Sequence, residues 1–233
     1  MSQESAGMPG EEVPAMLMAG GRSRDPDAMK RLMSQASGGI PKPQIAYIGT
    51  ASEDSLSFFQ MMKLTLKKAG AGKVTLVRLA KEKPNLDAAR QILAEADLIF
   101  ISGGEVEDGM KWLIKHGLVP YLKELYAQGK RFIGVSAGVI MLGSLWVRWD
   151  KPEDDSTAQL FDCLGIIPAL FDVHGEEEGW AELKTALRLM GDGARGYALP
   201  SGCAISADSQ GALVNLEKEY LVFANEGGQI RMA

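Results

Sequence analysis

Short apolar runs alternate with longer amphipathic stretches along most of this chain, and this alternation constrains the fold more than any other feature. Runs such as Ala15–Met18 (AMLM) and Leu98–Ser102 (LIFIS) are short and almost wholly apolar, which predicts buried strands. The stretches between such runs predict amphipathic helices. Strand and helix in repeated succession imply right-handed crossovers and a mostly parallel sheet covered on both faces. We therefore predict a three-layer α/β fold.

The same pattern places the remaining elements. Further strands are expected at Gln44–Ile48, Val74–Leu79, Phe132–Val135 and Ile166–Val173. Helices are expected at Asp27–Gln35, Glu53–Ala69 and Leu86–Ala94. Two more helical patterns are separated near residues 117–120, and another helix is expected to begin at Ala137. Ser52 is the expected N-cap of the second helix, with Glu53 and Asp54 in its first turn. Turn residues separate three short runs near the C-terminus, which predicts a short antiparallel edge from Cys203–Ser206, Ala212–Asn215 and Tyr220–Phe223.

The bulk composition excludes several classes of function. We expect a loose polar tail at 1–13 and a single α/β domain at 14–233, because 233 residues suit one such domain. The formal net charge is −5 and no run of Lys or Arg is present, so no nucleic-acid partner is expected. No signal peptide or membrane-spanning run is expected either. The two cysteines, Cys163 and Cys203, are too few for a disulfide scaffold and are not spaced as metal ligands. We therefore expect no metal site and a reducing, cytoplasmic location.

A G-x-S-x-G motif, Gly134–Gly138, carries the clearest chemical signal. It follows an apolar strand and precedes a helical run, which is the context of a nucleophile elbow. In such a turn the hydroxyl of Ser136 projects outward, and the backbone N–H of Ala137 is placed to stabilise an oxyanion. A tight turn with only a structural role is the alternative.

A neutral serine needs a base, and the chain has only two histidines. His116 ends a helical run and is expected to interact with the helix dipole there. His174 ends the predicted strand 166–173, which would place it at the same carboxyl edge as Ser136, so His174 is the expected base. The turn at Ser102–Gly104 ends a neighbouring strand and offers further backbone donors, whereas the Gly20-Gly21 turn has no nucleotide-binding motif around it.

The carboxylate that should orient the histidine is not fixed by the sequence. Asp172 lies two residues before His174, so on a strand the two side chains would share one face. A run of three glutamates, 176–178, is more simply a solvated helix start. The other candidates are Asp150, Glu153, Asp154 and Asp155.

These motifs, in this order and spacing, resemble the peptidase E and cyanophycinase family of serine peptidases. The matching segments are AMLMAGG, IAYIGTAS, LIFISGGE, GVSAGV, LFDCLGIIPALFDVH and YALPSG. The resemblance implies a flavodoxin-like fold related to class I glutamine amidotransferases, with no organic cofactor and a monomer or homodimer. It also implies Ser136 as nucleophile, His174 as base and the backbone of Gly104 and Ala137 as oxyanion hole. The resemblance also implies hydrolysis of peptide or isopeptide bonds next to aspartate.

Three positions depart from the family pattern. Ser201 stands where the family has the glutamate that orients the histidine, so Ser201, Asp150 and Asp172 are the candidates for the third member. Glu105 replaces the usual Asn or Asp after the glycine pair and, with Gly103, is expected to contact substrate. Glutamates follow His174 where aspartate-specific members have arginines, which favours a neutral or basic substrate. A serine peptidase acting on small peptides is the leading hypothesis; a catalytically impaired binding or regulatory module and an α/β-hydrolase esterase are the alternatives.

Overall fold

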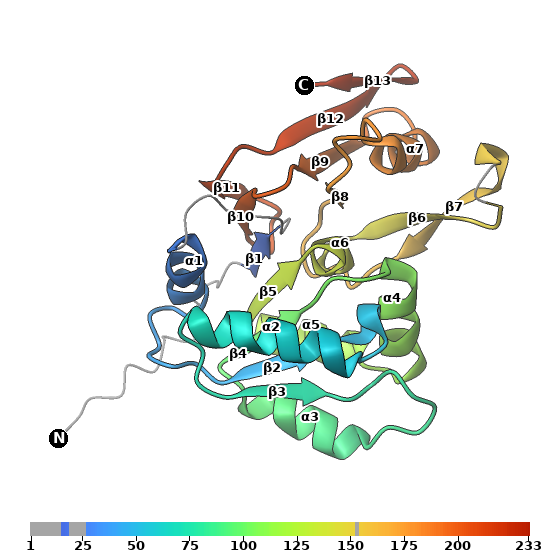
Figure 1. The fold of residues 1–233 in the computed structure, drawn as a ribbon. Helices are drawn as coiled ribbons and strands as arrows, with labels where there is room; N and C mark the ends of the chain where they lie inside the picture. Colours follow the sequence, from blue (N-terminus) through green and yellow to red (C-terminus); the bar gives the residue numbers. More distant parts are fainter. Residues whose placement is uncertain (1–14, 19–26, 152–153) are drawn as a thin grey trace.

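The computed structural model of the chain describes residues 15–18, 27–151 and 154–233. The expected tail at 1–13 and the Gly20-Gly21 turn lie outside these residues. Figure 1 shows a central sheet with helices on both sides and a second, smaller sheet near the C-terminal part of the chain. The three-layer α/β fold predicted from the sequence is therefore confirmed.

The central sheet contains seven strands in the order β11-β10-β1-β5-β4-β2-β3. The strands from β1 to β3 in this order are parallel, whereas β10 and β11 pair antiparallel and form the expected C-terminal edge. The third run expected at this edge, Tyr220–Phe223, is not part of it, because residues 221–223 pair in a second sheet. The bounds of the seven strands are β1 (Ala15–Met18), β2 (Ile45–Ile48), β3 (Val74–Val77), β4 (Leu98–Ile101), β5 (Arg131–Val135), β10 (Ala204–Ala207) and β11 (Leu213–Glu217).

Alternate residues of each central strand pack into two different cores. In β2, Ile45 and Tyr47 face one core and Ala46 and Ile48 face the other, as the pleat of a strand requires. Helices α1 (Ala28–Ala36) and α2 (Leu56–Lys68) cover the first face. The other face is covered by α3 (Leu86–Glu95), α4 (Val106–Lys115), α5 (Val119–Ala127) and α6 (Ala137–Leu142). Because both faces are buried, β1, β2 and β4 consist of buried, largely apolar residues throughout.

A second sheet, in the order β13-β12-β9-β8, lies beside this framework and was not expected. The apolar run 166–173 is not one strand, because only its last three residues pair in a sheet. The residues before them donate and accept loop hydrogen bonds around the end of α6. The elements of this region are a hairpin of β6 (Leu145–Trp149) and β7 (Ala158–Asp162), then β8 (Phe171–Val173), α7 (Ala181–Met190), β9 (Arg195–Leu199), β12 (Leu221–Glu226) and β13 (Gln229–Met232).

The start of α2 also differs from the prediction. Ser52 closes a short 3₁₀ turn, and Ser55 is the N-cap, accepting from the Phe58 N–H at 3.5 Å. Asp54 has a left-handed φ of 53°, and its carboxylate accepts the backbone N–H groups of Leu79 and Ala80 at 2.6 and 2.7 Å. This carboxylate therefore joins the loop after β2 to the end of β3 instead of capping a helix.

Both cysteines, Cys163 and Cys203, are buried free thiols. Burial raises the pKa of Cys163 to about 12 and that of Cys203 to about 11. Within the described ranges, no helix has the length and apolarity to cross a bilayer.

Candidate active site

Ser136 occupies a sharp turn between β5 and α6. Its backbone has φ 54° and ψ −124°, a left-handed conformation that is costly for a residue with a Cβ. Its N–H donates to the Met18 carbonyl of the neighbouring strand β1 at 3.0 Å, which fixes the turn to the sheet. The strand–turn–helix context predicted for the motif is present in the structure.

Neither glycine of the motif, Gly134 or Gly138, has room for a Cβ atom. A Cβ on Gly134 would lie 2.6 Å from the Gly138 carbonyl oxygen, so β5 and α6 approach too closely for a side chain. A Cβ on Gly138 would lie 2.2 Å from the Ile101 carbonyl oxygen of β4. Both contacts involve backbone, which cannot move aside cheaply. The glycines are therefore required by the packing of the elbow.

The turn after β4 lies against the serine, because β4 and β5 are neighbouring parallel strands. A Cβ on Gly103 would come within 2.9 Å of the Ser136 Cβ and 3.3 Å of its Oγ. Gly104 has φ 138° and packs against the Ala51 carbonyl, so it must be a glycine as well. In the part of the chain that the structure describes, the Gly104 N–H donates no hydrogen bond. Ala137 is the first residue of α6, so its N–H lacks a carbonyl partner within the helix.

His174 follows β8, so it comes from the second sheet and not from the central sheet as the sequence suggested. It has a left-handed φ of 61° and is half-buried. Strands β8 and β9 are parallel, with Val173 paired to Leu199, so the residues that follow each strand lie close together. As a result, the Nδ1 atom of His174 is 3.2 Å from the Oγ of Ser201.

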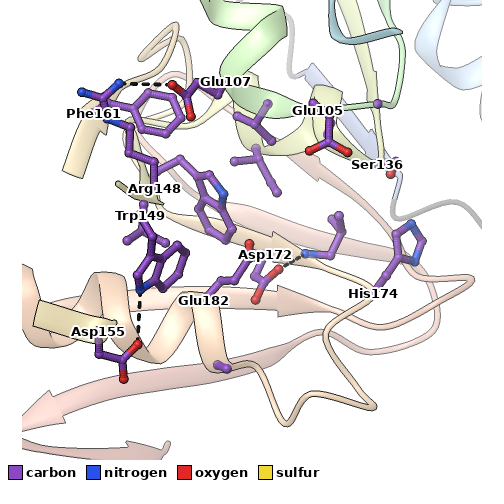
Figure 2. A pocket seen from close by; sticks show the side chains of 18 residues that line it. Glu105, Glu107, Ser136, Arg148, Trp149, Asp155, Phe161, Asp172, His174 and Glu182 are labelled. Atoms are coloured by element: carbon purple, nitrogen blue, oxygen red, sulfur yellow. Dashed lines mark hydrogen bonds and ion pairs between the residues drawn. The ribbon is translucent and has the colours of Figure 1, made fainter. Parts of the chain in front are cut away.

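Ser136 and His174 line the same pocket, which has a volume of about 620 Å³. Figure 2 shows both side chains at one end of this pocket. Among the described residues, no hydrogen bond joins the two side chains. The Gly104, Glu105 and Ala137 positions also line the pocket, so the expected nucleophile, base and backbone donors surround one space.

The candidates for the third triad member lie in different places. Ser201 is the one in hydrogen-bond contact with the imidazole. Asp150 is exposed on the β6–β7 hairpin, where it accepts from Gln159 at 2.9 Å. Asp154 caps a short 3₁₀ turn, Asp155 accepts from the Trp149 indole at 3.2 Å, and Glu153 lies outside the described residues.

Asp172 is buried, yet it does not hydrogen-bond to His174. Its carboxylate accepts the N–H of Val173 at 2.7 Å and that of Leu183 in the first turn of α7. It therefore joins β8 to the start of that helix. Burial, and secondarily the nearby charge of Glu182, raises the pKa of Asp172 to about 7. Two hydrogen bonds to the carboxylate offset only part of this effect.

The second histidine has a structural environment, as expected. His116 is the C-cap of α4, is buried and stacks on Trp112. Its Nε2 lies 2.9 Å from the Leu79 carbonyl oxygen, so this nitrogen carries the proton.

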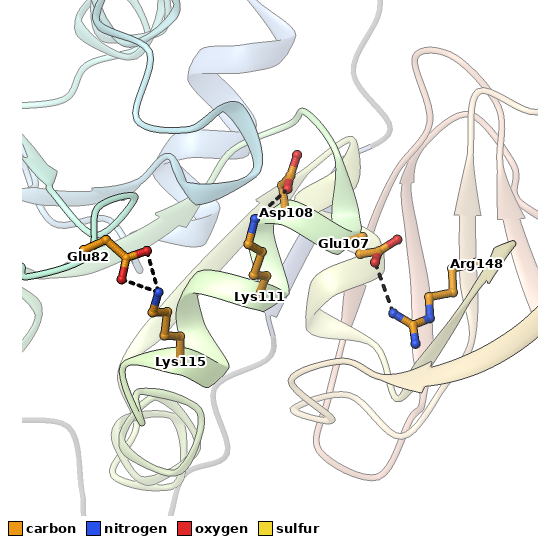
Figure 3. Close-up of polar contacts among 6 residues, drawn as sticks. All are labelled: Glu82, Glu107, Asp108, Lys111, Lys115 and Arg148. Carbon is orange, nitrogen blue, oxygen red and sulfur yellow. Dashed lines mark hydrogen bonds and ion pairs between the residues drawn. The ribbon is translucent and has the colours of Figure 1, made fainter. Parts of the chain in front are cut away.

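The sequence analysis missed the far wall of the pocket. Trp149 and Phe161 of the β6–β7 hairpin lie across the pocket from Ser136 (Figure 2), and Trp146 of the same hairpin also lines the pocket. Arg148, also on the hairpin, pairs with Glu107 of α4 at 3.1 Å (Figure 3). This hairpin carries no motif, so only its folded position reveals the contribution.

The pocket lining is acidic. Among the lining residues that the structure describes, five bear carboxyl groups, and the one guanidinium, that of Arg148, already has a carboxylate partner. The five are Glu105, Glu107, Asp155, Asp172 and Glu182. Within the described ranges, no group of three or more His, Cys, Asp or Glu side chains could hold a metal ion.

Together these features define a class: an α/β protein with a serine in a strained strand-to-helix elbow and a histidine in the same pocket. The sequence profile of Peptidase family S51 matches residues 15–214. The chain belongs to this family of serine-type peptidases, which confirms the resemblance seen in the sequence.

Two curated relatives are named peptidase E. The protein from Pasteurella multocida (strain Pm70) is 29% identical over 143 residues, which cover 58% of this chain and 60% of the relative. The protein from Haemophilus influenzae (strain PittGG) is 28% identical over 144 residues, covering 58% and 61%. The chain thus matches about 60% of the length of these relatives.

Solved structures share the fold over nearly the whole chain. A peptidase from an acI-B1 Actinobacterium has a TM-score of 0.71 at 19% identity, covering 95% of this chain and 94% of the other. A protein from Listeria monocytogenes EGD-e, described as a putative peptidase E, has a TM-score of 0.65 at 17% identity, covering 90% and 100%. At these identities the likeness concerns the fold alone.

Proposed function

We propose that this protein is a serine-type peptidase that hydrolyses small peptides through an acyl-enzyme on Ser136. The observation that carries the proposal is that a serine on a strained elbow and a half-buried histidine line one pocket of about 620 Å³. A strained backbone at a pocket is a recurrent feature of functional sites, because packing must hold the residue in place.

The chemistry would proceed in two halves. Ser136 Oγ attacks the peptide carbonyl carbon while Nε2 of His174 takes the hydroxyl proton. The N–H groups of Ala137 and Gly104 stabilise the carbonyl oxygen as it becomes negative. The C–N bond then breaks, the imidazolium returns its proton to the leaving amine, and water cleaves the acyl-enzyme by the same steps. No hydrogen bond between Ser136 and His174 is needed before substrate binds, since such contacts often tighten only in the complex.

The substrate is proposed to be neutral or basic where it meets the pocket wall. The carboxyl groups there would repel an aspartyl side chain and attract a cation. Matched peptides that differ in one residue, Asp, Asn or Lys, test this idea. We expect kcat/KM to be lowest for the Asp peptide, by about 10-fold or more relative to Lys. Equal or better turnover of the Asp peptide contradicts the substrate proposal and leaves the serine mechanism standing.

A fluorophosphonate probe tests the nucleophile directly. The wild-type protein should be labelled on Ser136, whereas Ser136→Ala should not be labelled. His174→Ala should lower peptide turnover by about 1,000-fold or more, because the base is lost. His116→Gln is the matched control, since that histidine lies outside the pocket. Labelling of Ser136→Ala equal to the wild type would refute the mechanism.

A catalytically impaired binding or regulatory module is the second candidate. Two observations favour it: the Nδ1 partner of His174 is the uncharged Ser201, and no hydrogen bond joins Ser136 to His174 within the described residues. A serine can orient an imidazole but cannot stabilise its cation by charge. Turnover of any peptide that disappears in His174→Ala eliminates this candidate, whereas peptide binding without turnover supports it.

A further inference from the structure

Ser201, the residue in contact with the imidazole of His174, is itself held by an acidic side chain. The backbone N–H of Ser201 donates to Oε1 of Glu176 at 2.6 Å. This contact brings the carboxylate to the serine whose Oγ lies 3.2 Å from Nδ1 of His174. Glu176 follows His174 by two residues, in the exposed turn before α7, and reaches back across the end of β9.

The hydrogen-bonding capacity of a hydroxyl allows it to serve both neighbours. A serine hydroxyl has one O–H donor and two acceptor lone pairs. Oγ of Ser201 can therefore accept the Nδ1–H of His174 while its own hydrogen points to Glu176. With the proton on Nδ1, the other ring nitrogen, Nε2, keeps the lone pair that a general base requires.

We propose that Glu176, acting through Ser201, takes the place of the acidic third member of the catalytic triad. The order of contact is imidazole, hydroxyl, carboxylate. Glu176 and Ser201 are thus positioning residues: they fix the tautomer of His174 and place a negative charge where the imidazolium forms. This inference rests on the proposed function. Neither residue lines the pocket, so we expect both to act through His174 and not by contact with substrate.

The surroundings of Glu176 keep its carboxylate charged. Partial burial raises the pKa of Glu176, but the hydrogen bonds from Ser201 and the charge of Lys218 outweigh burial and leave the pKa below its ordinary value. Lys218 also donates to the Ser201 carbonyl oxygen at 3.0 Å, which holds the serine in register with the carboxylate. The negative charge is therefore present at neutral pH.

Kinetics of four variants test the relay. Glu176→Gln and Ser201→Ala should each lower kcat by about 10-fold or more with little change in KM, since they act on the base and not on substrate binding. The double variant should lose no more than the stronger single variant, because both remove one pathway. Ser201→Glu combined with Glu176→Gln should restore most of kcat by placing a carboxylate directly at the imidazole.

Glu219→Gln is the matched control, because it removes the charge of an exposed glutamate that directly follows Lys218 in the sequence. It should keep the wild-type kcat. The relay is wrong if Glu176→Gln keeps the wild-type kcat, if only KM changes, or if the two single effects are additive.

A second measurement does not depend on turnover. Long-range ¹H–¹⁵N spectra of ¹⁵N-histidine-labelled protein report which ring nitrogen carries the proton. At a pH where the imidazole is neutral, His174 should be mainly Nδ1–H, and this population should fall in Glu176→Gln and Ser201→Ala. His116 should stay in the opposite tautomer, Nε2–H, in every variant, which makes it an internal reference.

The spectra also separate the two proposals. A tautomer of His174 that is unchanged by Glu176→Gln overturns the relay even if the enzyme is active. If the wild-type protein shows the Nδ1–H signature but is neither labelled by the probe nor active on peptides, the proposed peptidase function is wrong. The hydrogen-bonded relay from Glu176 to His174 is then still supported.

Discussion

The two halves of the candidate site are held by different kinds of contact. Ser136 belongs to the central sheet, where Gly134 and Gly138 let buried backbone approach within distances that exclude a Cβ. His174 belongs to the second sheet, where exposed side chains, Ser201 and Glu176, hold it through hydrogen bonds. The nucleophile is thus fixed by packing, and the base is fixed by polar contacts at the surface.

This difference indicates which half of the site can change in sequence. Close-packed backbone tolerates almost no substitution, because interiors have few voids and resist displacement. A hydrogen-bond pattern can be kept by other side chains that present the same donors and acceptors. The serine at position 201, where the family pattern has a glutamate, lies on the side of the site where exchange is physically easier.

Gly138→Ala should have the largest effect on stability. Its Cβ would lie 2.2 Å from the Ile101 carbonyl oxygen, so backbone has to move, and we expect a loss of about 3 kcal/mol. Gly202→Ala is the matched change on the base side. Gly202 has φ 83° but open space around it, so only the backbone strain of about 1 kcal/mol is expected. Urea unfolding measures both, and equal losses would remove the contrast between the two halves.

Asp172→Asn should have a smaller effect that depends on pH. The folded pKa is about 7 and the ordinary value 3.8, so between these pH values the folded state holds a proton that the unfolded state has lost. Wild-type stability therefore falls as pH rises from about 4 to 7 and then levels. The variant lacks this penalty, so its gain in stability should be near zero at pH 4, rise with pH and level off above pH 7.

The control for this experiment is Asp150→Asn on the exposed hairpin, which should change stability little at any pH. Urea unfolding at pH 4, 6 and 8 gives the comparison. A gain that is the same at pH 4 and pH 8 would show that the ionisation of Asp172 is not its source.

The central sheet could be predicted from the sequence because its signals are local. Strands such as Leu98–Ile101 are continuous apolar runs, and the elbow motif needs only the strand before it and the helix after it. Ser136, His174 and the backbone at Gly104 and Ala137 were placed in one site by the motif and the family resemblance, and they line one pocket.

The second sheet could not be predicted, because its pairings join distant segments through short strands. Phe171 pairs with Tyr197, which in turn pairs with Val222, and β8 has only three residues. The run before β8 is as apolar as a strand, but packing against α6 and not strand pairing buries it. The contact between Glu176 and Ser201 spans 25 residues and depends on the β8–β9 register, so no sequence spacing indicates it.

The smallest effect on stability is expected for a substitution in the β6–β7 hairpin, which forms the pocket wall outside the two larger sheets. Arg148 of the hairpin and Glu107 of α4 are 43% and 59% exposed, so Arg148→Gln should cost less than about 0.5 kcal/mol. The change nevertheless leaves the Glu107 carboxylate unpaired beside the pocket. We therefore expect the preference for a Lys peptide over an Asp peptide to rise about threefold, measured as a ratio of kcat/KM values.

Lys111→Gln provides the matched control for the charge. Lys111 pairs with Asp108 at 3.7 Å on α4, and neither residue lines the pocket (Figure 3). Lys111→Gln removes one positive charge, as Arg148→Gln does, and should leave the peptide preference unchanged. If the two variants shift the preference equally, the net charge of the protein sets selectivity and the hairpin has no special part in it. If only Arg148→Gln shifts it, the hairpin supplies the substrate-reading wall opposite the serine and the histidine.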